Sequence, residues 1–179
     1  RLITIESKNP NLYNELGDIY LRAGDKAQAV QNFEKAATIY EKVALYNNAV
    51  AVCKKIMRVD PEKIDTMFRL GELRAKQKLT GEAATFFTQY VEAVFENPQA
   101  NLQRSQRDVD LMLELVPSNG AILAKAVEVY EQLGMKLKAI EIYRTLITLA
   151  AGDGDSKQQT LYARKVEEIK ATLSSAELE

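Results

Sequence analysis

Histidine and tryptophan are absent from this sequence of 179 residues, and cysteine occurs once, as Cys53. The lack of histidine removes the commonest general base and the commonest metal ligand. A single cysteine excludes an intrachain disulfide and a four-cysteine metal site, and Cys53 lies in the stretch AVAVCKKIM at the spacing of a buried helix face. We therefore expect a structural thiol instead of a nucleophile, no catalytic centre, no metal and no cofactor.

Charge of one sign is not in excess either, because 24 basic and 25 acidic residues give a formal net charge of −1. A surface that follows nucleic-acid phosphates normally carries a basic excess, so nucleic acid is not an expected partner. The sequence has no apolar run long enough to span a membrane and no signal-peptide pattern. We expect a cytoplasmic protein without direct membrane insertion.

The two ends of the sequence carry their own expectations. The chain begins with Arg1 instead of methionine, which predicts a fragment of a longer protein. The final pair, Leu178-Glu179, resembles the residues that a common C-terminal tag vector leaves behind. We therefore exclude residues 178–179 from the fold prediction.

Proline and glycine are scarce, and the few that occur lie mainly between segments of helical periodicity. This distribution of helix-breaking residues is typical of an all-α protein, and we find no credible strand. The connections are short, so consecutive helices should be antiparallel neighbours. Nine helices are expected, at about residues 11–23, 26–43, 47–59, 62–77, 81–95, 102–115, 121–133, 136–150 and 156–173.

The first of these helices contains a glycine, which destabilises a helix by about 1 kcal/mol relative to alanine. This glycine belongs to a repeated motif. The motif reads aromatic-x2-Leu-Gly-x2-Tyr, followed by Ala-x3-Phe in the next helix. It returns twice with changes, and in the last copy valine (Val127) replaces the glycine. Its members are Tyr13, Leu16, Gly17, Tyr20, Ala29 and Phe33; Met67, Leu70, Gly71, Ala83 and Phe87; and Tyr130, Ala139 and Tyr143.

This pattern resembles the tetratricopeptide repeat, and the resemblance covers nearly the whole chain. It implies a right-handed solenoid of antiparallel helices, from a bacterial protein, in which stacked hairpins share one core. The motif residues are then expected to pack in that core instead of forming a site. Gly17 is expected at a close helix–helix contact, and the last hairpin, which has Val127, should be more loosely paired.

The spacing of the motif differs from a plain array of 34-residue repeats. Ala29, Ala83 and Ala139 are 54 and 56 residues apart, and Pro61 and Pro117 are also 56 apart. We interpret residues 1–177 as one solenoid domain of three three-helix units, at about 10–61, 62–117 and 118–175, with helix 156–173 as a cap. This spacing leaves open which helices line the inner face.

In the family, the first helix of a hairpin usually lines a concave groove that takes a peptide. Carried over, the groove positions are Asn14, Asp18, Leu21 and Arg22 in the first unit, Asp65, Phe68, Arg69, Glu72 and Lys76 in the second, and Ala124, Lys125, Glu128 and Gln132 in the third. Phe68 is either an aromatic anchor for a partner or a residue that packs on the neighbouring unit.

One subtype of the family clamps acidic C-terminal tails with basic groove residues. Asn14, Asp18 and Asp65 stand at clamp positions here, and only Arg69 fits the clamp. The two aspartates would repel a carboxylate, so we do not expect this chain to be an acidic-tail clamp.

The expected function is a non-enzymatic interaction module or scaffold that binds a peptide or partner protein through a helical groove. A dedicated chaperone for a secretion or assembly client is the alternative, although the repeat spacing does not suit it. RNA binding by helical repeats is a third class, against which the near-neutral charge argues.

Overall fold

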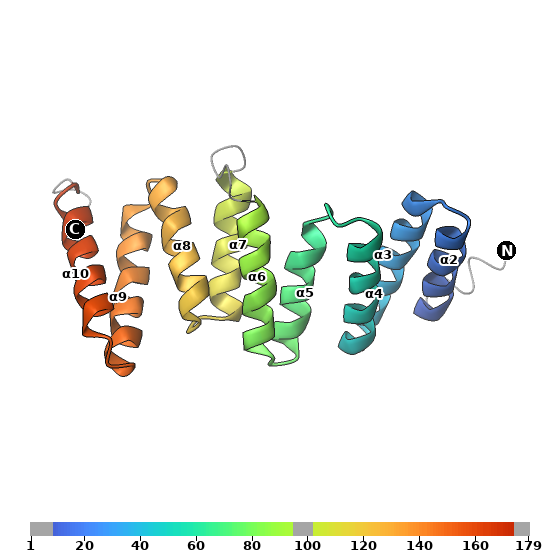
Figure 1. Ribbon diagram of the computed structural model, residues 1–179, viewed down its shortest axis with the longest axis horizontal. Coiled ribbons are helices and arrows are strands. Elements are labelled where there is room, and N and C mark those ends of the chain that lie inside the picture. The colour runs from blue at the N-terminus through green and yellow to red at the C-terminus, as the bar shows by residue number, and fades with distance from the viewer. Residues whose placement is uncertain (1–8, 95–101, 174–179) are drawn as a thin grey trace. The chain divides into compact units, whose positions relative to one another are not determined.

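The computed structural model describes residues 9–94 and 102–173, and within these ranges the chain forms nine helices and no strand (Figure 1). The all-α, solenoid-type fold predicted from the sequence is confirmed. The helices are α2 (Pro10–Arg22), α3 (Lys26–Lys42), α4 (Tyr46–Val59), α5 (Asp65–Lys76), α6 (Thr80–Val94), α7 (Leu102–Leu115), α8 (Gly120–Gln132), α9 (Lys136–Gly152) and α10 (Ser156–Lys170).

Most helix ends lie within a few residues of their predicted positions. The helix expected from residue 62 begins at Asp65, because turns occupy the residues that follow Pro61. The helix expected to end at Ala150 continues to Gly152. The predicted helix end at Phe95, the stop at Asn97-Pro98 and the pair Leu178-Glu179 lie outside the described residues.

Polar caps fix the start of several helices. The side-chain oxygen of Asp25 accepts a hydrogen bond from the backbone N–H of Gln28 at 3.0 Å, and Asp155 does the same for Gln158 at 3.0 Å. Each aspartate thereby satisfies one of the N–H groups that a helix leaves unpaired at its start. The helices on either side of Asp25, α2 and α3, are joined by a short turn and pack against each other.

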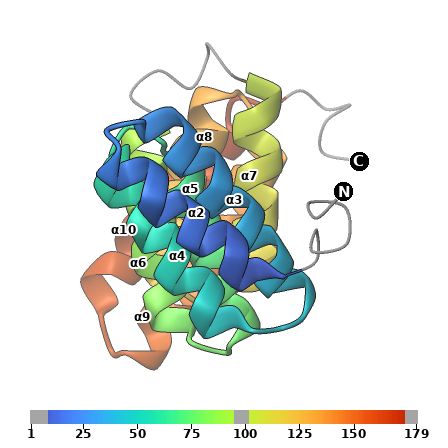
Figure 2. The ribbon, with the colours of Figure 1, turned by 90° about the vertical axis from the view of Figure 1, so that its right-hand side faces the viewer.

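The chain divides into two compact units, which we call the N-terminal unit (Arg1–Tyr90) and the C-terminal unit (Val91–Glu179). In the N-terminal unit, which Figure 2 shows with α2 nearest the viewer, α2 packs on α3, α3 on α4 and α4 on α5. In the C-terminal unit, α7 packs on α8, α8 on α9 and α9 on α10. The division into three three-helix units stays a prediction.

In two hairpins of the N-terminal unit, a glycine of the first helix packs against a phenylalanine of the second helix. A Cβ atom placed on Gly17 of α2 would lie 2.4 Å from Cε1 of Phe33 in α3. A Cβ atom on Gly71 of α5 would lie 2.4 Å from Cε1 of Phe87 in α6. Both phenylalanine rings are fully buried. The close contact expected at Gly17 is therefore present in both hairpins, and the lost helix propensity is offset by packing.

Leu16 differs from the expectation that every motif residue packs in the core. Its side chain is 41% exposed, whereas Leu70 at the equivalent place in α5 is 2% exposed. Leu70 belongs to a core cluster that contains residues of α3 and α4, the helices that precede α5. Within the described part of the chain no helix precedes α2, so Leu16 has no such neighbour. Met67 is half-buried and lines a cleft, whereas the other motif residues are buried or packed against the core.

The C-terminal unit replaces the glycine contact with a different packing. Val127 of α8 is buried, and the backbones of α8 and α9 approach each other less extensively than those of α2 and α3. Asp110 of α7 accepts hydrogen bonds from Tyr130 of α8 and Lys138 of α9, both at 2.6 Å. The hairpin expected to be more loosely paired is thus tied by a polar network to the helix before it.

Replacing Gly17 by alanine should destabilise the protein by about 1–3 kcal/mol, although alanine is the better helix former. The added methyl would overlap the ring of Phe33, which is fully buried, so the helices or the ring would have to shift. Gly81→Ala is the matched control, because nothing lies within 4 Å of a Cβ placed on Gly81 in α6. Urea unfolding of both variants measures the difference. Equal unfolding free energies for the two variants would contradict the packing role.

Candidate functional site

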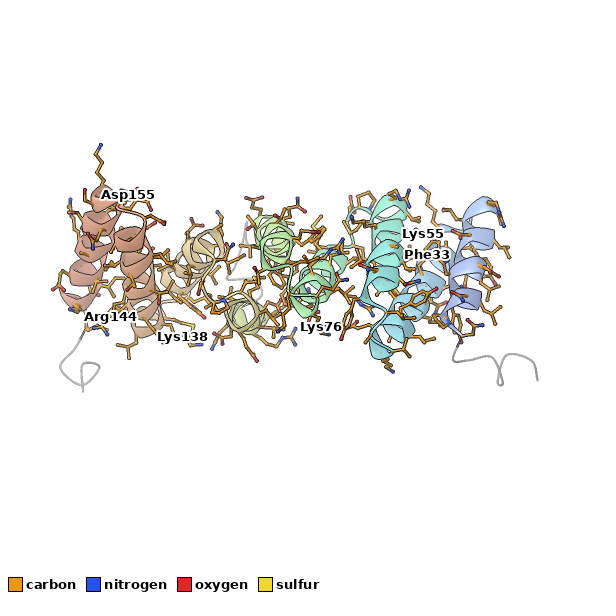
Figure 3. The ribbon with its side chains drawn as sticks, turned by 90° about the horizontal axis from the view of Figure 1, so that it is seen from below. Phe33, Lys55, Lys76, Lys138, Arg144 and Asp155 are labelled. Carbon is orange, nitrogen blue, oxygen red and sulfur yellow. The ribbon has the colours of Figure 1, made fainter. Side chains whose placement is uncertain are left out.

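Two of the predicted groove residues meet a lysine that the sequence did not single out. Lys55 of α4 donates to Asn14 Oδ1 at 2.9 Å and to both carboxylate oxygens of Asp18, at 2.8 and 2.7 Å. Its ammonium group also lies 5.1 Å from the centre of the Phe33 ring (Figure 3). Lys55 therefore links α4 to α2 beside the Phe33 ring, and the charge of Asp18 is paired with that of Lys55.

Two other predicted groove residues meet on α3 instead. Arg69 of α5 donates through Nε and Nη2 to Glu41 Oε2, at 3.2 and 2.9 Å, and Nη2 also donates to Thr38 at 3.0 Å. Lys76 of α5 donates to the other oxygen of Glu41 at 2.5 Å. Burial alone would raise the pKa of Glu41, but the hydrogen bonds and charges of Lys76 and Arg69 hold that pKa below its ordinary value.

These contacts show how the helices of the N-terminal unit alternate. Successive helices pack directly, Lys55 joins α2 to α4, and Glu41 joins α3 to α5. The helices therefore lie in two rows, with α2 and α4 in one row and α3 and α5 in the other. A unit of three helices places its first helices, α2 and α5, in different rows. The structure consequently does not bring the predicted groove residues of α2 and α5 together.

Phe68 packs inside its own hairpin. Its ring centre lies 5.3 Å from that of Phe87 and 5.0 Å from that of Tyr90, both in α6. These distances are typical of aromatic pairs in protein cores. Phe68 is half-buried, and these two rings already hold it in place. Of the two interpretations of Phe68, the structure supports packing, with the partner in the same hairpin instead of a neighbouring unit.

The remaining predicted groove residues lie in both units and are described within each unit by itself. In the C-terminal unit, Lys125 pairs with Glu128 at 3.1 Å on the same helix face, while Ala124 is half-buried and Gln132 is exposed. In the N-terminal unit, Leu21, Arg22 and Asp65 are exposed and Glu72 is half-buried. A partner-binding role for these residues stays a prediction.

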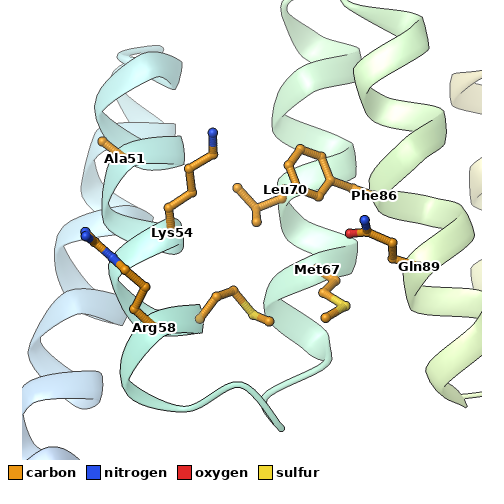
Figure 4. A pocket seen from close by; sticks show the side chains of 8 residues that line it. Ala51, Lys54, Arg58, Met67, Leu70, Phe86 and Gln89 are labelled. Carbon is orange, nitrogen blue, oxygen red and sulfur yellow. The ribbon is translucent and has the colours of Figure 1, made fainter.

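Sequence reasoning missed a cleft in the N-terminal unit. It has a volume of about 640 Å³ and is lined by α4, α5 and α6 (Figure 4). Its apolar residues are Met57 of α4, Met67 and Leu70 of α5, and Phe86 of α6. Since α4 and α6 form its two walls and α5 lies between them, α6 belongs to the same row as α4.

Polar residues form the rim of this cleft. Lys54 and Arg58 of α4 and Gln89 of α6 are exposed, and Ala51 leaves space beside Lys54 (Figure 4). No acidic residue is among the eight that line the cleft. The cleft thus combines an apolar floor with two positive charges. No sequence pattern predicts this cleft, because its residues come from three helices. They lie close together only because successive helices alternate between two rows.

The single thiol of the sequence lies in the core of the N-terminal unit. Cys53 is fully buried, and burial raises the pKa of its thiol to about 11, so the nucleophilic thiolate is scarce at neutral pH. Among the described residues, no group of three or more cysteine, aspartate or glutamate side chains is placed to hold a metal ion. None of the described helices combines the length and the apolar character needed to cross a membrane.

The stabilising effect of Glu41 should depend on pH. Because the pKa of Glu41 is lower in the folded protein than its ordinary value of 4.5, the contribution is complete above pH 4.5 and is lost as the pH falls through the folded pKa. Glu41→Gln should therefore cost about 1 kcal/mol at neutral pH and progressively less in acid. Urea unfolding of both proteins across this range measures the difference. Glu15→Gln, at an exposed position of α2, is the control; a constant cost of Glu41→Gln at every pH would contradict the account.

Two segments of the chain match a known family. A family model described as tetratricopeptide repeat matches residues 10–43, which contain α2 and α3. A second model of the same description matches residues 121–153, which contain α8 and α9. The two matched hairpins are those in which Gly17 meets Phe33 and in which Val127 stands at the equivalent position.

Solved structures give weaker likenesses, and no curated protein matches the sequence. A crystal structure of MamA protein aligns with 94% of this chain and 97% of its own, at 18% identity and a TM-score of 0.43. The MamA fragment 41-end from Desulfovibrio magneticus RS-1 aligns over 93% and 97%, at 19% identity and a TM-score of 0.39. PilW, titled a widely conserved type IV pilus biogenesis factor, aligns over 92% and 95%, at 12% identity and a TM-score of 0.31. With every TM-score below 0.5, these likenesses carry no argument about function.

Proposed function

We propose that this chain, a tetratricopeptide-repeat protein, binds a short segment of a partner protein in the cleft between α4, α5 and α6. The premise is that proteins of this family serve as scaffolds for protein interactions. We further propose that it acts without catalysing a reaction. The sequence has no histidine, and its one thiol is buried with a raised pKa. The groups that usually activate a nucleophile or transfer a proton are therefore scarce.

The observation that carries this proposal is the apolar floor of an open cleft. Met57, Met67 and Phe86 are only partly buried, although each contributes a large apolar surface. An apolar side chain of a partner would remove this surface from water, which is the main favourable contribution to most protein associations. The volume of about 640 Å³ is within the range of ligand-binding clefts.

The two methionines of the cleft indicate an adaptable fit. A methionine side chain is unbranched and polarisable, so it fills irregular gaps and accepts different apolar groups. Met57 of α4 and Met67 of α5 both line the cleft. We expect the cleft to accept several large apolar side chains, with selectivity supplied by the polar rim. The dedicated-chaperone alternative has no observation of its own to favour it.

The substitution Ala51→Trp tests this proposal. Ala51 is exposed at the rim, so tryptophan would fill the cleft without disturbing the core. Peptides selected from a random display library on the wild-type protein should lose at least about tenfold in affinity for this variant. Fluorescence anisotropy with labelled peptides measures the dissociation constants.

Ala163→Trp, at an exposed position of α10 in the C-terminal unit, is the matched control and should leave the affinity unchanged. Unfolding curves establish that both variants are folded. The proposal fails if the library yields no binding peptide, or if the selected peptides bind the Ala51→Trp variant as tightly as the wild type.

A further inference from the structure

We propose that the segment bound in the cleft is acidic, with carboxylates beside the apolar side chain that enters the floor. This inference rests on the proposed function and adds the chemistry of the partner. It starts from Lys54 and Arg58, which stand four residues apart on α4 and therefore on one face of the helix. Both are exposed, and both line the cleft.

The two cations of the rim differ from most of their neighbours in having no ion-pair partner among the described residues. Lys55, on the next position of the same helix, is paired with Asp18 at 2.7 Å. Lys63, which follows α4, is paired with Glu34 at 2.9 Å, and Arg69 with Glu41 at 2.9 Å. Asp18, Glu34 and Glu41 are thus each held by another cation, and none of the three forms an ion pair with Lys54 or Arg58.

The opposite wall of the cleft does not supply the missing charge. The α6 residues that line it are Phe86 and Gln89, neither of which is acidic. Glu82, one turn before Phe86 on α6, is held by Arg74 of α5 at 3.1 Å. The positive charge of the rim is therefore open to an anion that arrives from outside.

Binding of a neutral segment would have an electrostatic cost. An apolar side chain seated on the floor covers the aliphatic stems of Lys54 and Arg58 and removes water from their charged ends. Carboxylates on the segment would replace that water, with a two-point hydrogen bond to Arg58 and a single one to Lys54. Side chains four residues apart on a helix are about 5–6 Å apart, so carboxylates one helical turn apart on the partner match this spacing.

A protein segment fits these observations better than nucleic acid. The apolar floor beside the two cations offers hydrocarbon and thioether groups where a phosphate backbone would need further positive charge. The whole sequence has a net charge of −1, which gives no general attraction for a polyanion. An acidic segment with an apolar anchor uses both the floor and the rim.

The test compares peptides that differ only in charge. A peptide selected on the wild-type protein is synthesised with its acidic residues intact, replaced by glutamine, or replaced by lysine. We expect the acidic form to bind about tenfold more tightly than the glutamine form, with a preference that falls as salt rises. The double variant Lys54→Glu/Arg58→Glu should reverse the order and prefer the lysine form. The double variant Lys26→Glu/Lys42→Glu changes two exposed lysines of α3 outside the cleft and should keep the wild-type order.

The outcomes separate this inference from the proposed function. If acidic and glutamine forms bind equally, and Ala51→Trp abolishes both, the cleft binds peptides but the partner is not acidic. If a fluorescent single-stranded oligonucleotide binds more tightly than the peptide and is lost on charge reversal, the ligand class is nucleic acid and the inference is wrong. If no peptide is selected, the proposed function fails first.

Discussion

The contact between a helical glycine and the face of a buried phenylalanine ring determines how the N-terminal unit is built. Gly17 on Phe33 and Gly71 on Phe87 bring two pairs of helices to the same close distance. A side chain on either glycine would overlap a fully buried ring, and in a close-packed core this overlap would push the helices apart. This spacing lets Lys55 reach across from α4 to α2, and Glu41 connect α3 with α5. The alternation of rows follows from these contacts.

The alternation of rows in turn creates the cleft. With α4 and α6 in one row and α5 behind them, the apolar side chains of three helices converge on a space that none of the three closes. Nearby charges are used to hold the rows together, whereas Lys54 and Arg58 stay at the rim. The same packing that stabilises the unit therefore leaves an apolar surface and positive charge at one place, where a partner segment is proposed to bind.

The sequence was sufficient for the helices and for the glycine contact, because both depend on residues close together in the chain. Gly24-Asp25 marks the turn between α2 and α3, and the spacing from Gly17 to Phe33 belongs to one hairpin. The exposure of Leu16 was not predictable, since it depends on which helix lies next to α2. The cleft was not predictable either. Met57, Met67 and Phe86 lie on different helices, and the assumed three-helix unit placed α2 and α5 on one face.

Methionine methyl NMR tests the central claim, recognition in the cleft, most directly. The chain has four methionines: Met57 and Met67 line the cleft, whereas Met112 and Met135 lie in the C-terminal unit. Isotope labelling of the methyl groups therefore gives two reporters and two internal controls in one sample. On titration with a selected peptide, the resonances of Met57 and Met67 should shift together, while those of Met112 and Met135 stay in place. Shifts confined to Met112 or Met135, with Met57 and Met67 unchanged in the presence of bound peptide, would contradict the account.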